Sequence, residues 1–270
     1  MLLITGVTGY VGKSVWKILE TEERSIRVVA RRPAFDGLRN NIEWVVVDNL
    51  FTLDESSLRE LLCGVDTVLH VAWYAEHGKY LDSLENMMCV EGTLRMARIA
   101  VEAGVSHFVG VGTCLEYEQG GDVLTTSTAL NPLSLYASSK CATYYMLRSL
   151  FKFYDVAFSW ARLFYIYGGE EAPTRLHALL HDNLSKKMPV SLGPADVVRD
   201  YLHVDSVAKH LVNIVDHRFV GDINICSGDP TTIGEIAVQI AHIYGASDLL
   251  SFANTDTNAS LSYVLGEPSL

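Results

Sequence analysis

A tyrosine and a lysine four residues apart have the spacing in this sequence that most directly suggests chemistry. Tyr136 and Lys140 are the ends of the segment YASSK. In a helix this spacing puts both side chains on one face, one turn apart. A positive charge stabilises phenolate, so Lys140 is predicted to lower the pKa of Tyr136 and make it a general acid or base. Taken alone, the motif is weak, because a Tyr and a Lys four residues apart occur by chance on the surface of many helices.

Three glycines spaced by three follow a short apolar run at the start of the sequence. Gly6, Gly9 and Gly12 are followed by apolar residues that recur with helical spacing as far as Leu19. This order predicts a strand, a tight turn and a helix whose N-terminus binds phosphate. Gly6 would allow the turn, Gly9 the approach of a pyrophosphate, and Gly12 close packing of helix on strand. The alternative is a glycine turn without a ligand.

Both segments resemble one family. Residues 5–12, TGVTGYVG, resemble the TGxxGxxG motif of the extended short-chain dehydrogenase/reductases, also called the NAD-dependent epimerase/dehydratase family. Residues 136–140 resemble that family's catalytic YxxxK motif. Four further blocks follow in the family's order, namely VLHVA at 68–72, GTCLEY at 112–117, RLFYIYG at 162–168 and RDYLHVD at 199–205.

The resemblance implies which residues contact a dinucleotide. The glycine turn would bind the pyrophosphate. The acid after the third strand would contact the adenine, and the end of the fourth strand would line the nicotinamide side. The residues so implied are Gly6, Thr8, Gly9, Tyr10, Val11, Asp48, Val71 and Ala72, together with Tyr136 and Lys140.

Strand and helix patterns alternate along the first part of the chain. Strands are predicted at 26–30, 42–47, 66–71, 107–111 and 156–163, with helices between them. This alternation predicts an α/β fold with a doubly wound parallel sheet, a Rossmann domain. We assign 1–164 to the dinucleotide-binding domain and 165–270 mostly to a small substrate lobe, interleaved with the first and with a soft boundary.

Composition narrows the class of protein. A chain of 270 residues can bury a sizeable core, and no apolar stretch is long enough to span a bilayer. The net charge of −11 argues against a nucleic-acid partner. Five cysteines are scattered without a CxxC pair, which predicts free thiols in a reducing cytosol and no metal site.

Two arginines favour one form of the cofactor. Arg31 and Arg32 follow the second predicted strand, and the first acid after them is Asp36. Guanidinium groups there accommodate the 2′-phosphate of NADP, whereas a carboxylate would bind the ribose hydroxyl of NAD. NADP is therefore preferred to NAD. Two solvated arginines at the start of a loop are the alternative.

The family's pattern implies a third catalytic group. Thr113 stands four residues before Tyr117, where relatives carry a catalytic Ser or Thr. Its hydroxyl would bind the substrate oxygen while Tyr136 exchanges a proton and Lys140 holds the nicotinamide ribose. Dehydratases of the family carry Asp and Glu directly after this position, where the present chain has Cys114 and Leu115. Dehydration is therefore not expected, and the catalytic residues are Thr113, Tyr136 and Lys140.

The resemblance also implies a nucleotide-linked sugar as substrate. Arg199 matches an arginine that grips the diphosphate in relatives, and Arg175 would assist it, although both also fit surface ion pairs. Tyr165 replaces an asparagine that touches the diphosphate, which leaves the exact substrate class open. Helices near 84–103 and 136–152 would build a homodimer. The sequence ends where relatives usually continue, so either the member is short or the sequence is truncated.

Three hypotheses follow for the function. The first is an NADP-dependent enzyme that reduces a nucleotide-linked 4-keto-6-deoxysugar in the cytoplasm. The second is a nucleotide-sugar 4-epimerase with bound NAD. The third, from another class, is an NADP-sensing binding protein that has the fold without turnover. The presence of both Tyr136 and Lys140 argues against the third.

Overall fold

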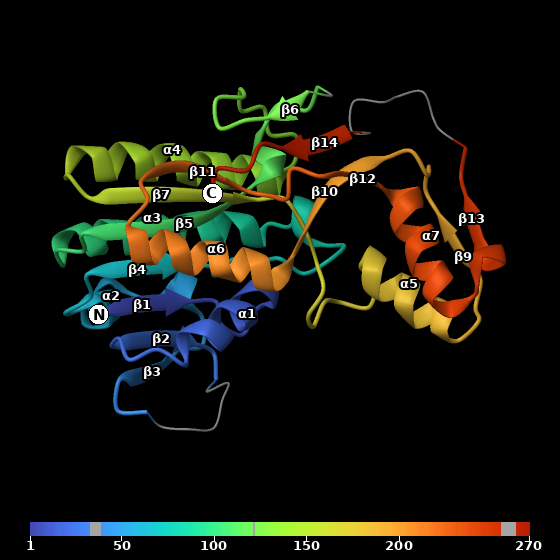
Figure 1. Cartoon of the computed structure of the whole chain (residues 1–270). Helices are drawn as coiled ribbons and strands as arrows, with labels where there is room; N and C mark the ends of the chain where they lie inside the picture. The colour runs from blue at the N-terminus through green and yellow to red at the C-terminus, as the bar shows by residue number, and fades with distance from the viewer. Residues whose placement is uncertain (33–38, 121, 255–262) are drawn as a thin grey trace.

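A seven-stranded parallel sheet forms the centre of the molecule (Figure 1). The computed structural model describes residues 1–32, 39–120, 122–254 and 263–270. The strand order is β11-β7-β5-β4-β1-β2-β3, which confirms the predicted doubly wound sheet. The strands are β1 (Leu2–Thr5), β2 (Ile26–Ala30), β3 (Ile42–Val46), β4 (Thr67–His70), β5 (His107–Thr113), β7 (Ala157–Leu163) and β11 (Gly221–Ile225).

Helices cover both faces of this sheet, as Figure 1 shows. Because parallel strands are buried on both faces, their sequences are short apolar runs; all four residues of β1 are buried. One face packs against α1 (Tyr10–Leu19) and α6 (Val204–His217). The other face packs against α2 (Glu55–Leu62), α3 (Glu85–Glu102) and α4 (Leu135–Phe153).

A small lobe lies to one side of the sheet in Figure 1, built around its own apolar cluster. It contains α5 (Leu176–Ser185), α7 (Ile233–Tyr244), β9 (Val190–Leu192) and β13 (Leu250–Phe252). A second sheet connects this lobe to the central one. Its strands are β6 (Val123–Leu124), β8 (Tyr165–Tyr167), β10 (Val198–His203), β12 (Pro230–Thr232) and β14 (Tyr263–Gly266).

The chain passes between the two parts more than once. Both α6 and β11 come after residue 165 in the sequence, yet α6 packs on α1 and β11 pairs with β7 in the central sheet. The boundary at residue 165 stays a prediction. Within the described ranges, no helix is long and apolar enough to cross a bilayer, and no cluster of three or more His, Cys, Asp or Glu residues could hold a metal ion.

Candidate active site

The glycine turn packs directly on the segment that follows β4. Gly6 has a φ of +82°, and a Cβ at this position would lie 2.6 Å from the amide nitrogen of Ala72. A Cβ on Gly12 would lie 1.9 Å from the carbonyl oxygen of Gly6. Neither position can therefore carry a side chain unless the backbone beside it moves. The strand order reverses between β1 and β4, which is where doubly wound sheets bind ligands.

The start of α1 is open toward this crevice. Its N-cap is Gly9, and no side chain caps the helix. Backbone N–H groups in the first turn can therefore face an anion. The hydroxyl of Tyr10 donates to the carbonyl oxygen of Gly168 at 2.8 Å, and the Arg175 guanidinium lies 4.8 Å from the centre of the Tyr10 ring. Arg175 thus lies beside the predicted pyrophosphate site.

A buried histidine ties the two strands of the crevice together. The ring nitrogens of His70 hydrogen-bond the hydroxyls of Thr5, at 2.9 Å, and Thr93, at 3.0 Å. Thr5 also accepts the N–H of Ala72 at 3.2 Å. Burial lowers the pKa of His70 to about 3, so its ring is neutral. This network fixes Val71 and Ala72, the predicted nicotinamide contacts, against the glycine turn.

The three predicted catalytic residues come together at the carboxyl end of β5. Thr113 is the last residue of β5, and Tyr136 and Lys140 lie in the first two turns of α4. Ser134 caps that helix by accepting the N–H of Ala137 at 3.2 Å. Burial raises the pKa of Tyr136 above its ordinary value, while a hydrogen bond with the Thr113 side chain acts in the opposite direction. Tyr136 is therefore a neutral phenol beside a hydroxyl.

The pKa of Tyr136 is raised rather than lowered, because burial outweighs any effect of Lys140 on the phenol. The Nζ of Lys140 donates to the carbonyl oxygen of Val111 at 2.7 Å and lies 3.7 Å from the centre of the Trp73 ring. The ring of Tyr136 is 6.0 Å away. Burial lowers the pKa of Lys140 to about 7, against the opposing effect of Glu116. Desolvation is thus the largest effect on the pKa of Tyr136 and on the pKa of Lys140.

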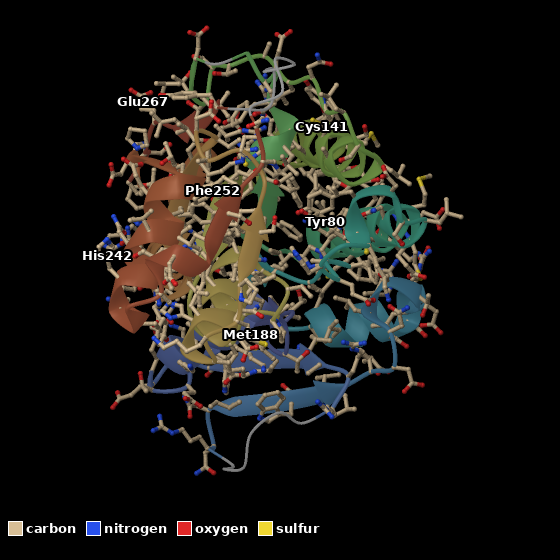
Figure 2. The ribbon with its side chains drawn as sticks, turned by 90° about the vertical axis from the view of Figure 1, so that its right-hand side faces the viewer. Tyr80, Cys141, Met188, His242, Phe252 and Glu267 are labelled. Carbon is tan, nitrogen blue, oxygen red and sulfur yellow. The ribbon has the colours of Figure 1, made fainter. Side chains whose placement is uncertain are left out.

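Two aromatic residues of the site were not anticipated. Trp73 covers the ammonium group of Lys140, and Tyr80 packs edge-on against Tyr136, with ring centres 4.7 Å apart and an interplanar angle of 89°. Tyr80 begins the short 3-10 helix η2 (Tyr80–Asp82), and Figure 2 shows it beside α3 and α4. The only signal in the sequence is the concentration of aromatic residues after the fourth strand.

A buried carboxylate holds Thr113 in place. Thr113 caps the 3-10 helix η3 (Cys114–Glu116), and its N–H donates to Glu116 Oε1 at 2.8 Å. Glu116 Oε2 accepts the Arg162 Nε–H at 2.7 Å and the Trp160 Nε1–H at 2.9 Å.

Cys114 stands where dehydratases of the family carry a carboxyl group. Burial raises the pKa of its thiol to about 12, so the thiol stays protonated near neutral pH.

The predicted substrate residues lie on the lobe side of this site. The Arg199 guanidinium is 5.2 Å from the centre of the Tyr165 ring, and Tyr201 is 5.6 Å from the same ring. Burial raises the pKa of Tyr165, and charge interactions with Cys114 and Tyr80 contribute to the shift. Tyr165 and Arg199 thus lie on the side of the site that holds Cys114 and Tyr80. Arg175 pairs with Glu171, at 3.4 Å, and its charge acts on Tyr10 and on Tyr80.

The predicted adenine and 2′-phosphate contacts lie at the other end of the crevice. Arg31 and Arg32 are exposed directly after β2, and Asp48 is exposed after β3. Asp36 lies outside the described residues. These positions stay predictions.

Comparison with known sequences identifies the family. The NAD dependent epimerase/dehydratase family matches residues 2–226. An uncharacterized UDP-glucose epimerase, YtcB of Bacillus subtilis, is 22% identical over 99% of this chain and 87% of its own length. The dTDP-6-deoxy-L-talose 4-dehydrogenase (NAD(+)) of Aggregatibacter actinomycetemcomitans is also 22% identical, over 86% of each chain.

Solved structures share the fold. The UDP-glucose 4-epimerase of Thermus thermophilus, in complex with NAD, superposes with a TM-score of 0.81 at 21% identity, covering 99% of this chain and 90% of its own. MoeE5, in complex with UDP-glucose and NAD, gives a TM-score of 0.81 at 23% identity, covering 99% and 88%. The chain is an enzyme of the NAD dependent epimerase/dehydratase family.

Proposed function

We propose that this enzyme reduces the keto group at C4 of a nucleotide-linked 4-keto-6-deoxysugar. The observation that carries the proposal is the neutral Tyr136 phenol beside the Thr113 side chain. An oxygen that gains negative charge during reduction needs a proton donor, and a buried phenol with a raised pKa keeps its proton near neutral pH. Tyr136 is therefore ready to protonate a forming alkoxide.

The crevice fits a nicotinamide dinucleotide. Gly6 and Gly12 let the turn pack tightly against the backbone of Ala72 and of Gly6 itself, and the first turn of α1 carries no side-chain cap that would compete with a phosphate. Gly9, Tyr10 and Val11 would bind the pyrophosphate, with Arg175 beside them. The dinucleotide, when bound, supplies the hydride. Arg31 and Arg32 support NADP over NAD because a guanidinium pairs well with a phosphate monoester.

The chain's own residues orient the substrate and move the proton. The Thr113 hydroxyl would hydrogen-bond the C4 oxygen, held in position by Glu116 at its backbone N–H. Tyr136 would deliver its proton to the same oxygen. Lys140 would bind the nicotinamide ribose and add a positive charge to the site. Cys114 and Leu115 provide no acid or base for removing water, so the reaction stops at proton and hydride exchange.

A nucleotide-linked sugar is the substrate class that the lobe supports. Arg199 and Tyr165 contact each other on the side of the site that holds Cys114 and Tyr80, and they would contact the diphosphate. Two relatives with sequence similarity over most of the chain carry names that refer to UDP-glucose and to dTDP-6-deoxy-L-talose. A CDP-abequose synthase of Salmonella typhimurium is also 22% identical over 80% of this chain.

A 4-epimerase is the second candidate. It is favoured by the names of matched relatives, since YtcB is described as a UDP-glucose epimerase. Epimerisation would require the same residues to remove and return the proton of the C4 hydroxyl, while the bound dinucleotide would take up and return the C4 hydride. The intermediate ketone would have to turn over between the two steps. That cycle favours tightly held NAD, so the identity of the bound cofactor separates the candidates.

One experiment distinguishes these functions. The protein is incubated with NADPH or NADH and a panel of nucleotide-linked 4-keto-6-deoxysugars, and the absorbance of the reduced cofactor is followed. Stoichiometric loss of the cofactor supports the reductase. Conversion of a nucleotide sugar to its epimer without net change in cofactor would establish the epimerase instead. Tight binding of NADP without turnover of any sugar would indicate a sensor.

A substitution of the proton donor tests the mechanism. Tyr136→Phe keeps the aromatic ring and removes the hydroxyl, so turnover should be lost while the Kd for the cofactor is retained. Activity within a factor of about ten of the parent would contradict the role of Tyr136, since general acid catalysis contributes about 100-fold or more.

We further propose a homodimer formed through α3 and α4. Large apolar side chains are exposed on and beside these helices, including Met87 at 49%, Met146 at 58% and Phe153 at 80%. Phe151, which the sequence also suggested for this surface, is fully buried against the sheet. Light scattering of Met146→Glu against the parent tests the proposal, because a charge in the interface should yield monomers.

A further inference from the structure

Both members of the Tyr136–Lys140 pair are covered by an aromatic side chain from the same loop. The loop joins β4 to α3 and carries Trp73 and Tyr80, here called the aromatic pair. The Trp73 ring lies 3.7 Å from Lys140 Nζ, and the Tyr80 ring packs edge-on against Tyr136. Apart from η2, which Tyr80 begins, this loop has no regular structure, so it needs an anchor to hold two rings in fixed positions.

Asn86, in the first turn of α3, provides this anchor. Its side chain is completely buried, and its Oδ1 accepts the Trp73 Nε1–H at 2.9 Å. Its Nδ2 donates to the carbonyl oxygens of Tyr80, at 2.7 Å, and Ser83, at 2.9 Å. The amide thus uses its acceptor and both donors, and two of these three bonds go to the aromatic pair.

We propose that Asn86 is a positioning residue of the active site, which acts by fixing Trp73 over Lys140 and Tyr80 against Tyr136. The importance of these two residues for turnover rests on the proposed function. The positioning itself rests on the buried bonds of the Asn86 amide. Removing that amide releases the indole N–H and two backbone carbonyl groups, so the loop loses its fixed attachment to α3.

The consequence is measurable at Lys140. Burial has lowered the pKa of Lys140 from 10.5 to about 7, with Trp73 forming one wall of its surroundings. Loss of a cation–π contact alone would lower that pKa further, but such a contact is weak compared with the desolvation that it accompanies. Displacement of Trp73 therefore raises the pKa of Lys140 through hydration. The other titratable groups facing Lys140 are Glu116 of η3, Cys89 of α3, His70 of β4 and Tyr136 of α4.

The test measures the titration of Lys140 in the full chain. The rate of acetylation of Lys140 by acetic anhydride is followed by peptide mass spectrometry at a series of pH values, because only the free amine reacts. In the Asn86→Leu variant, the apparent pKa of Lys140 should rise by about one unit or more. Asn41→Leu is the matched control, because the Asn41 amide also donates to two backbone carbonyls, both at 2.9 Å, but on the far side of β2.

Two further variants keep the test decisive. Trp73→Leu removes the cover itself and should produce the same shift as Asn86→Leu. If Asn86→Leu does not fold, Trp73→Phe removes the bond to Asn86 while keeping an aromatic ring, and a smaller shift in the same direction is expected. An unchanged Lys140 titration in the folded Asn86→Leu variant, or in Trp73→Phe where it replaces that variant, would overturn the proposal.

Turnover separates this proposal from the proposed function. With a sugar substrate, Asn86→Leu should lower kcat more than it raises the Kd for the cofactor. If the parent protein turns over no sugar, the proposed function fails, whereas the Lys140 titration still decides whether Asn86 positions the pair.

Discussion

Replacing Glu116 by glutamine should strongly destabilise the protein. Glu116 is fully buried, and its carboxylate accepts N–H groups from Thr113, Trp160 and Arg162. A glutamine of nearly the same size would remove the charge and place an NH2 group where one oxygen now faces these donors. Arg162, which is 1% exposed, would keep its hydrogen bond to the Tyr117 hydroxyl, at 3.4 Å. Its remaining counter-charge among the described residues would be the partly exposed Asp222, whose Oδ1 is 3.5 Å from its Nη1.

The expected loss is about 3–5 kcal/mol, because a buried arginine would be left without its main counter-charge. This is a large fraction of the 5–15 kcal/mol or so that typically separates folded from unfolded protein. Asp182→Asn provides the comparison, since the Lys186–Asp182 pair is similarly close, at 2.6 Å, but exposed on α5. Its loss should change the free energy of unfolding by less than about 1 kcal/mol.

Urea unfolding of the two variants measures both free energies, with the m-value as a check that the transition remains two-state. The double variant Glu116→Gln, Arg162→Met should recover part of the loss, because it no longer buries an unpaired charge. If Glu116→Gln costs no more than Asp182→Asn, the buried pair does not stabilise this site and the reasoning is refuted.

Three other perturbations test separate parts of the structure. Gly12→Ala should destabilise the fold by about 1–3 kcal/mol and weaken cofactor binding, because its Cβ would overlap the Gly6 oxygen, whereas Gly193→Ala, which meets no atom within 4 Å, should be neutral in both assays. Burial lowers the pKa of His107 to about 4, so as the pH falls below 6.5 the unfolded state binds more protons there, and this residue lowers the free energy of unfolding by at most about 1.4 kcal/mol per pH unit. In His107→Gln, the free energy of unfolding measured by urea titration should depend less on pH between pH 6.5 and 5. An unchanged dependence would contradict the lowered pKa of His107. Arg199→Ala should raise the Kd for a nucleoside diphosphate about tenfold or more in calorimetry and leave the cofactor Kd unchanged.

The sequence predicted the parts of this enzyme that depend on local pattern. The strand at 26–30 coincides with β2, and the glycine turn has the contacts expected for Gly6 and Gly12. Thr113, Tyr136 and Lys140 converge because the first turns of α4 pack beside the carboxyl end of β5, which is the edge where doubly wound sheets bind ligands. The strands of the lobe are mostly two to four residues long, too short to show alternation, so they were not located.

The surroundings of the catalytic pair could not be predicted from spacing. The four-residue interval correctly places Tyr136 and Lys140 on one helix, but the pKa of each depends on what buries it. Trp73 and Tyr80 come from a loop whose sequence has no periodicity, and Asn86 acts through contacts with both of them. Such effects are tertiary, and only the folded structure shows that desolvation outweighs the charge of Lys140.

The position of β11 has a consequence for synthesis on the ribosome. β11 is the edge strand next to β7, yet its residues, Gly221–Ile225, are translated after much of the lobe. Until they emerge, the backbone of β7 presents an unpaired edge on a sheet that is otherwise assembled, and such edges recruit other chains. A nascent chain that ends before β11 is therefore expected to aggregate or bind chaperones, and release from them should follow translation of this strand.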